Sequence, residues 1–244
     1  MNLRGKTVLV TGAAKRIGRE IAKGFASRGA HVLIHYHSSK KEAEGLAREL
    51  RLLRVKSQLC RANLLKVNEI RSMVRKILRD HGGVDVLVNN ASLFGRTPFE
   101  KVGEEDWENF LGIHVKAPFF LAQALAPVMK KRGGGRIINI ADWSGLRPYR
   151  DYLPYCVSKG AMMTMTQALA KTLAPEVLVT AVCPGPILPP AAMGKRERVG
   201  VAKKTLVGRW GRPEDIARMV VFLAEQDFVT GSYHLVDGGE SLRS

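Results

Sequence analysis

The sequence predicts an α/β protein, a single doubly wound, mostly parallel sheet of about seven strands with helices on both faces. Short apolar runs rich in β-branched residues alternate with longer segments of helical periodicity along almost the whole chain. This alternation is typical of parallel sheets, because each helix carries the chain back across the sheet. The length of 244 residues suits one such domain, and no repeat, low-complexity tract or linker divides residues 1–244.

The individual elements follow from the periodicity. The predicted strands cover residues 7–10, 31–35, 57–60, 84–88, 136–140, 177–182 and 233–236. The predicted helices cover residues 17–28, 40–53, 67–80, 105–131, 155–173 and 213–224. Residues 184–212 interrupt the alternation with several prolines and a basic cluster. Because this segment follows the carboxyl end of a strand, where ligands bind in open α/β sheets, we expect a lid over the substrate. The alternative is an insert without a function.

The charge of the chain is strongly basic, with 39 Lys and Arg residues against 22 Asp and Glu and a net charge of +17. A basic surface attracts nucleic acids or anionic metabolites. No nucleic-acid recognition motif accompanies the charge, so we expect no nucleic-acid partner and interpret the chain as an enzyme with a polyanionic cofactor.

The sequence also bears on the cellular compartment. No apolar run approaches the roughly 18 residues of a membrane span. The opening residues, MNLRGKTVLV, lack the features of a signal peptide. Cys60, Cys156 and Cys183 show no paired spacing, so neither a disulfide framework nor a zinc site is expected. We expect a cytoplasmic protein.

A glycine-containing loop follows the first predicted strand and opens the first predicted helix. It reads TGAAKRIG over residues 11–18, and its candidate cofactor-binding residues are Gly12, Lys15, Arg16, Ile17 and Gly18. Glycines there let the backbone approach a pyrophosphate, which the positive end of the helix also attracts. The motif is weak by itself, because Arg16 occupies the place of the central glycine in the usual dinucleotide loop.

The end of the second predicted strand distinguishes between nicotinamide cofactors. NAD-binding folds commonly place an acidic residue there for the ribose 2′-hydroxyl. This chain has no carboxylate at that point and carries instead His35, Tyr36, His37, Ser38 and Ser39. Hydroxyls and cations suit a 2′-phosphate, so NADPH is the expected cofactor. The histidines have no thiolate or carboxylate beside them, so we expect no metal site.

A tyrosine and a lysine four residues apart form the candidate reaction centre. Tyr155 and Lys159 share one face of a predicted helix, and Asp142 lies thirteen residues earlier. A nearby ammonium favours phenolate, so we expect Lys159 to lower the pKa of Tyr155 from its usual value of about 10. Such a tyrosine is a proton donor for reduction beside a hydride source.

Six short motifs, in order, resemble those of the short-chain dehydrogenase/reductase family. They are TGAAKRIG at 11–18, NNAS at 89–92, YCVSK at 155–159, CPG at 183–185, RPED at 212–215 and VDGG at 236–239. The resemblance implies a Rossmann-type, dinucleotide-binding catalytic domain. Four departures, Arg16, Ser92 with Phe94, Asp142 and the stretch 35–38, resemble the pteridine reductase branch, which reduces pterins, and often dihydrofolate, with NADPH.

This resemblance implies roles for residues on both sides of the pocket. Arg16 would contact the cofactor phosphates and border the substrate, Ser92 would touch cofactor and substrate, and Phe94 would stack on the pterin. Tyr155 would donate a proton to the substrate and Lys159 would hold the nicotinamide ribose. The further cofactor contacts that it implies are Asn63 and Leu64 at the adenine, and Asn90, Ala91, Pro184, Gly185 and Ile187.

Asp142 favours a pterin over a ketone as substrate. Negative charge builds on a ketone oxygen during hydride transfer, and an ionised carboxylate there would oppose it. A pterin presents N–H groups that a carboxylate accepts, and a ring nitrogen that must receive a proton. An aspartate with a raised pKa serves either need. The alternative is that Asp142 only caps backbone amides at a strand end.

The sequence therefore predicts an NADPH-dependent reductase of pterins, with dihydrofolate as a further candidate substrate. The alternatives are a carbonyl or 3-oxoacyl thioester reductase of the same family, and a regulator that binds NADPH and nucleic acid without catalysis. His114 stands where the family usually has an asparagine of a proton relay, so the relay is open to question. Because the family is usually tetrameric through paired long helices and the C-terminal strand, we expect a homotetramer.

Overall fold

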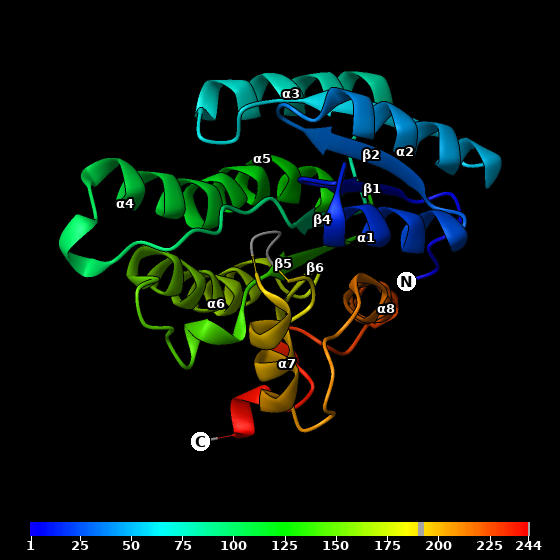
Figure 1. Ribbon diagram of the computed structural model, residues 1–244. Helices are drawn as coiled ribbons and strands as arrows, with labels where there is room; N and C mark the ends of the chain where they lie inside the picture. The colour runs from blue at the N-terminus through cyan, green and yellow to red at the C-terminus, as the bar shows by residue number, and fades with distance from the viewer. Residues whose placement is uncertain (190–192, 244) are drawn as a thin grey trace.

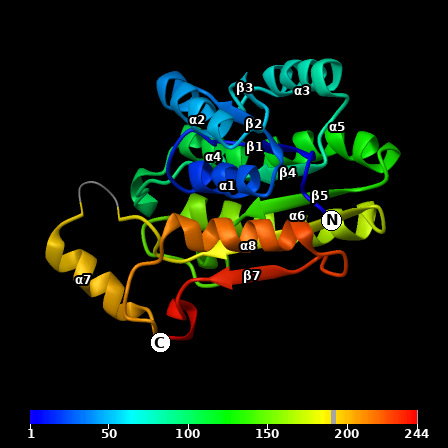
Figure 2. The ribbon, with the colours of Figure 1, turned by 90° about the vertical axis from the view of Figure 1, so that its right-hand side faces the viewer.

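The computed structural model describes residues 1–189 and 193–243, and it shows a seven-stranded sheet between two layers of helices (Figure 1; Figure 2). The strand order is β3-β2-β1-β4-β5-β6-β7, and each of the described pairings is parallel. The order reverses between β1 and β4, which lie side by side at the centre of the sheet. The predicted doubly wound α/β fold is confirmed.

The elements occur in the expected sequence along the chain. The strands are β1 (Thr7–Val10), β2 (His31–Tyr36), β3 (Ser57–Arg61), β4 (Val86–Asn89), β5 (Gly135–Ile140), β6 (Val177–Pro184) and β7 (Tyr233–Val236). The α-helices are α1 (Arg16–Ser27), α2 (Lys40–Leu52), α3 (Val67–His81), α4 (Glu104–Leu111), α5 (Ala117–Lys131), α6 (Leu153–Leu173), α7 (Lys195–Lys204) and α8 (Pro213–Glu225).

The strands are apolar on both faces because each face is covered by helices. In β1, Val8 and Val10 belong to a core shared with α1, α2 and α8, whereas Leu9 belongs to a core shared with α3 and α5. The same alternation recurs in β2, β4 and β5. Side chains that point to opposite faces at every second residue therefore build two cores from one continuous apolar run.

The long helix predicted over residues 105–131 is interrupted. α4 ends at Leu111, a π-helical turn covers Gly112–Lys116, and α5 begins at Ala117. The combined run Glu104–Lys131 has the length and apolar composition of a membrane span, so the expectation that no such stretch exists was wrong. Its α5 part packs against α3 and β5, which explains the apolar composition as that of a core helix.

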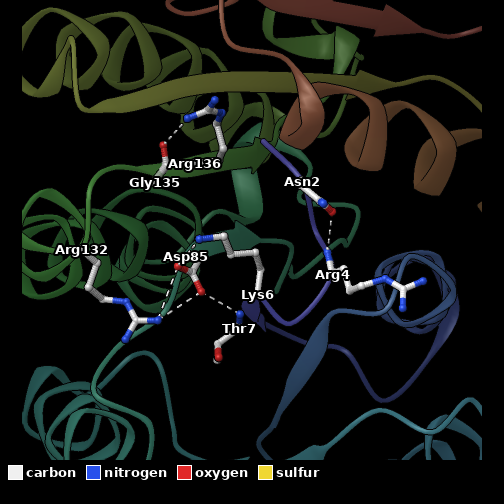
Figure 3. A network of polar contacts seen from close by, with 8 residues as sticks. All are labelled: Asn2, Arg4, Lys6, Thr7, Asp85, Arg132, Gly135 and Arg136. Atoms are coloured by element: carbon white, nitrogen blue, oxygen red, sulfur yellow. Dashed lines mark hydrogen bonds and ion pairs between the residues drawn. The ribbon is translucent and has the colours of Figure 1, made fainter.

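A buried carboxylate lies at the end of the sheet where the central strands β1 and β4 begin (Figure 3). Asp85 is 2 % exposed and accepts a hydrogen bond of 2.8 Å from the backbone N–H of Thr7. Its oxygens also lie 3.4 Å from the nearest nitrogens of Lys6 and Arg132. Two cations and a backbone donor stabilise the buried charge. This network ties the start of β1 to the start of β4, at the end of the sheet opposite the loops that follow these strands.

The predicted lid contains a helix that the sequence pattern does not reveal. β6 extends to Pro184, and α7 occupies residues 195–204. None of the α7 residues is buried, which explains why the segment shows no apolar periodicity. Residues 190–192 of the predicted lid lie outside the described part of the chain.

Candidate active site

Loops from the two halves of the sheet are joined by hydrogen bonds where the strand order reverses. The hydroxyl oxygen of Thr11 accepts from the backbone N–H of Asn90 at 2.8 Å and of Ala91 at 3.0 Å. In return, Asn90 Nδ2 donates to the carbonyl oxygen of Thr11 at 2.8 Å. These bonds hold the loop after β1 against the loop after β4, at the crevice where open α/β sheets bind ligands.

The loop after β1 has the geometry of a phosphate cradle. Gly12 has φ +62°, and a Cβ atom there would lie 3.0 Å from Ala91 Cα. Arg16 has φ 54°, in the left-handed region that glycine adopts without strain. Its guanidinium lies 3.4 Å from the carbonyl oxygen of Leu188, at the start of the predicted lid. Arg16, which stands in place of the glycine of the usual dinucleotide loop, therefore brings a cation to the border between this loop and the predicted lid.

His35 is used inside the protein. Its Nδ1 accepts from the backbone N–H of Gly12 at 3.0 Å, and its Nε2 pairs with the carbonyl oxygen of Ala62 at 3.1 Å. Burial lowers its pKa to about 4, so the ring is neutral and Nε2 carries the proton. Both ring nitrogens thus have partners inside the protein, and the contact of His35 with a cofactor stays a prediction. His35 fixes the shape of the Gly12 loop.

Polar side chains gather at the carboxyl end of β2, as the sequence predicts. His37 and Ser38 are exposed, Ser39 is half-buried, and Tyr36 is buried. Lys15 forms a 2.6 Å ion pair with Glu42 of α2, so its ammonium is already partnered. Following β3, Leu64 is buried in the core below the loop and Asn63 Oδ1 accepts from the backbone N–H of Leu65 at 3.0 Å.

The two candidate acids of the reaction centre are in direct contact. The Tyr155 hydroxyl donates to Asp142 Oδ2 at 2.8 Å, and Asp142 Oδ1 accepts from the backbone N–H of Ser144 at 2.8 Å. One oxygen therefore caps the short 3-10 helix at residues 143–145, while the other faces the tyrosine. Burial raises the pKa of Asp142, against the opposing hydrogen bond from Ser144. Both interpretations of Asp142, cap and site residue, describe part of its environment.

The expected effect of Lys159 on Tyr155 was wrong. Lys159 Nζ donates to the carbonyl oxygen of Ile140 at 2.8 Å and lies 5.6 Å from the centre of the Tyr155 ring. Burial, followed by the charge of Asp142, raises the pKa of Tyr155 well above its usual value. Burial also lowers the pKa of Lys159 to about 8. The phenol therefore keeps its proton at neutral pH, since desolvation outweighs the attraction of the ammonium.

An aromatic wall borders the reaction centre. The Phe94 ring stacks on Tyr152, with centroids 5.0 Å apart and planes at 16°, and meets Tyr155 edge-on at 5.0 Å. Phe94 is nevertheless 55 % exposed, so much of its ring is available to a ligand. An ion pair of 2.6 Å between Arg96 and Asp151 joins the segments that carry Phe94 and Tyr152. This Arg96–Asp151 clasp holds the wall in place.

The predicted cofactor residues Pro184, Gly185 and Ile187 lie at and just after the end of β6, where they pack against other parts of the fold. A Cβ atom on Gly185 would lie 2.6 Å from Asp237 Cα, so only glycine fits between β6 and the VDGG segment. Pro184 ends the strand, and Ile187 is buried in the core below α1 and α8. Among the described residues, no group of three His, Cys, Asp or Glu side chains is placed to hold a metal ion.

Sequence reasoning missed several residues that shape the site. Thr11 lies inside the quoted loop motif, but its hydroxyl bonds across the sheet become apparent only when β1 and β4 are neighbours. Ser158, inside the YCVSK motif, contacts the His114 ring. Tyr152 and the Arg96–Asp151 clasp carry no motif, because the two segments that they join are far apart in the sequence.

Comparison with known proteins places this arrangement in a family. The family model described as "Enoyl-(Acyl carrier protein) reductase" matches residues 12–241. The 3-oxoacyl-[acyl-carrier-protein] reductase FabG of Thermotoga maritima is 33 % identical, with 98 % of this chain and 99 % of the relative covered. The chain therefore belongs to the short-chain dehydrogenase/reductase family of oxidoreductases, which confirms the resemblance.

Two solved structures match nearly the whole chain. FolM Alternative dihydrofolate reductase 1 from Brucella canis, complexed with NADP, superposes with a TM-score of 0.93 and 29 % identity, covering 100 % of this chain and 96 % of that one. L-sorbose reductase from Gluconobacter frateurii, complexed with NADPH and L-sorbose, has a TM-score of 0.92 and 29 % identity, with 98 % of both chains covered.

Proposed function

We propose that the protein is a cytoplasmic, NADPH-dependent reductase of pterins, with dihydrofolate as a further substrate. The observation that carries this proposal is the 2.8 Å hydrogen bond between Asp142 Oδ2 and the Tyr155 hydroxyl. It places a carboxyl group beside the candidate proton donor, where a ketone reductase needs a neutral donor for the developing oxyanion. The NADP-complexed FolM structure, with its TM-score of 0.93, adds support from a dihydrofolate reductase.

The chain offers a suitable place for NADPH. The Gly12 cradle and the positive end of α1 would hold the pyrophosphate. The exposed His37 and Ser38, in a position without a carboxylate, would accept the 2′-phosphate. Asn63 and Leu64 would border the adenine, and Asn90, Ala91 and Lys159 the nicotinamide ribose. When bound there, NADPH supplies the hydride.

The residues of the chain would then bind and protonate the ring. Phe94 would cover one face of a flat heterocycle, because its own ring is fixed by Tyr152 and remains largely exposed. A carboxylate has about four lone-pair positions, and two of those on Asp142 are used by Ser144 and Tyr155. The others would accept N–H groups of a pterin. Tyr155, which keeps its proton at neutral pH, would be the proton donor.

The test compares substrates with NADPH as the reductant. Purified protein is mixed with 7,8-dihydrobiopterin, dihydrofolate, a panel of ketones and a 3-oxoacyl thioester, and NADPH oxidation is followed. We expect turnover of a pterin or folate. Tyr155→Phe should abolish turnover yet leave the Kd for NADPH within about threefold, since the phenol contributes a proton and little binding. Turnover of ketones alone would reject the pterin assignment.

A 3-oxoacyl thioester reductase is the second candidate, because the Thermotoga maritima relative with that name is 33 % identical over almost its whole length. The same substrate panel separates the two functions. Asp142→Ser replaces the carboxyl with a neutral hydroxyl. This variant should lower kcat/KM for pterin reduction by about a hundredfold or more. If Asp142→Ser leaves pterin kinetics unchanged, Asp142 has no part in the reaction.

We also propose a homotetramer. Phe119 of α5 with Leu153 and Val157 of α6 are exposed apolar side chains on the long helices, and Tyr233 and Leu235 are exposed on the edge strand β7. Apolar side chains gathered on the outer helices and on a sheet edge are typical of interfaces. Light scattering should give the mass of four chains, and Val157→Glu should lower it. A monomeric wild-type protein would contradict this assembly.

A further inference from the structure

His114 is a buried histidine held between two serine hydroxyls. The residue is 0 % exposed and lies in the π-helical turn between α4 and α5. Its Nε2 lies 2.8 Å from Ser92 Oγ and its Nδ1 lies 2.8 Å from Ser158 Oγ. The imidazole also meets the Tyr155 ring edge-on, with centroids 5.5 Å apart. His114 therefore connects the loop that carries Ser92 to the helix that carries Tyr155.

The neighbouring groups decide which nitrogen carries the proton. Ser158 has a single hydroxyl proton, and it donates that proton to the carbonyl oxygen of Tyr155 at 2.7 Å. The Nδ1 of His114 must then be the donor in its bond with Ser158. Burial lowers the pKa of His114 well below its usual value, so the ring is neutral and Nε2 is an acceptor.

The acceptor on Nε2 fixes the direction of the Ser92 hydroxyl. Two acceptors lie within reach of that hydroxyl, His114 Nε2 at 2.8 Å and the carbonyl oxygen of Leu93 at 3.1 Å. The shorter bond also satisfies a buried lone pair that has no other partner among the described contacts. With its proton turned toward His114, Ser92 presents only lone pairs on its exposed side.

We propose that His114 is a positioning residue that makes Ser92 a hydrogen-bond acceptor, so that the pocket selects a heterocycle with an amino or ring N–H group at this point. The inference rests on the proposed function and specifies its substrate class. Asp142 and Ser92 then both accept hydrogen bonds from the ligand. A simple carbonyl substrate offers only an acceptor oxygen and would find no donor at Ser92. The edge of a pterin carries amino and ring N–H groups, which can donate a hydrogen bond to Ser92.

Among the described residues, His114 makes no direct hydrogen bond to Lys159. A proton passed from Ser92 through His114 reaches Ser158, whose hydroxyl ends on a backbone carbonyl. Lys159 Nζ makes its own bond to the carbonyl oxygen of Ile140. The described contacts thus contain no hydrogen-bonded path from His114 to Lys159. These direct contacts fit a residue that orients a hydroxyl.

The first test reads the tautomer directly. The NADP⁺-loaded enzyme is labelled with [¹⁵N]histidine, and long-range ¹H–¹⁵N spectra are recorded between pH 6 and 8. Six histidines contribute, and the His114 signals are those absent from His114→Gln. We expect a neutral Nδ1–H ring at every pH. Ser158→Ala, which removes the partner of Nδ1, should release the Nε2–H tautomer. A wild-type Nε2–H ring or a titrating imidazolium would overturn the proposal.

The second test measures coupling to Ser92. His114→Asn shortens the side chain, keeping an amide near Ser158 but withdrawing the acceptor from Ser92. We expect Ser92→Ala and His114→Asn each to raise KM for 7,8-dihydrobiopterin about tenfold, the loss of one hydrogen bond. Because His114 acts through Ser92, the double variant should also show about tenfold. If the two effects multiply instead, so that KM of the double variant rises about a hundredfold, the proposal is overturned.

His81→Asn is the matched control, because His81 also pairs through Nε2, at 2.7 Å with Gln58, but lies at the end of α3. It should leave KM unchanged. The two proposals fail separately. If the wild-type enzyme reduces no pterin, the proposed function is rejected, and the NMR spectra still decide whether Ser92 is an acceptor. If the pterin is reduced and the effects of Ser92→Ala and His114→Asn on KM multiply, only the role of His114 is rejected.

Discussion

Gly18→Ala should damage the cofactor cradle from inside α1. A Cβ atom at this position would overlap the carbonyl oxygen of Gly12 and lie 2.5 Å from Asn90 Nδ2. Overpacking costs about 1–3 kcal/mol, and the upper value applies because a backbone carbonyl yields little. The higher helix propensity of alanine offsets about 1 kcal/mol of it. The free energy of unfolding should therefore fall by about 2 kcal/mol.

Gly45→Ala provides the control for the same substitution in a helix. Gly45 lies in α2, and its Cβ atom would meet only Arg48 Nη2 at 3.9 Å, so this variant should gain about 1 kcal/mol. The difference of about 3 kcal/mol corresponds to roughly 6–12 °C in Tm, measured by differential scanning fluorimetry. Gly18→Ala should also raise the Kd for NADPH at least about tenfold, because the cradle must open. Equal Tm values for the two variants would refute this account of the loop.

Three further predictions concern the reaction centre and its wall. The lowered pKa of Lys159, about 8, means that its charge is lost as pH rises past 8, so kcat/KM should fall above that pH; a profile that is flat to about pH 9.5 would contradict the buried ammonium. The folded state raises the pKa of Asp142, so ionisation of this carboxyl destabilises the fold at neutral pH but not below its unfolded pKa. The Tm of Asp142→Asn relative to wild type should therefore be higher at pH 7 than at pH 4, and the reverse order would reject the sign. Arg96→Ala should lower stability by less than about 1 kcal/mol, because the ion pair with Asp151 is largely exposed, yet raise KM for a pterin by freeing Phe94. Arg28→Ala breaks an exposed pair of 2.8 Å with Glu225 away from the site and should leave KM unchanged.

The sequence predicted the fold well because its signals are local and repeated. Alternating apolar runs and helical patterns place all seven strands of the described sheet within two residues of their observed bounds. The break at Gly112–Lys116 could not be predicted, because a π-helical turn has no residue pattern of its own. α7 could not be predicted either, since an exposed helix without a buried face has no pattern to detect.

The candidate site was predictable as a set of residues and not as a set of interactions. Spacing brings Tyr155 and Lys159 to one helix face, but it does not reveal how deeply they are buried. Burial reversed the expected direction of the Tyr155 pKa. The motif at the end of β2 includes His35 without showing that both of its ring nitrogens are used inside the fold. Such partners depend on which strands are neighbours, and this is a property of the whole chain.

The π-helical turn between α4 and α5 has a consequence for comparisons with other members of the family. A turn of this kind contains one residue more than an α-turn, so Gly112–Lys116 carries a one-residue surplus. α4 packs on α6, and α5 packs on α3 and β5. Removing the surplus residue would restore an α-helical turn and keep α4 and α5 in phase, so Phe110 would still meet Tyr155 edge-on. A relative that is one residue shorter here is therefore best aligned with its gap inside this turn, where insertion and deletion leave both flanking helices in phase.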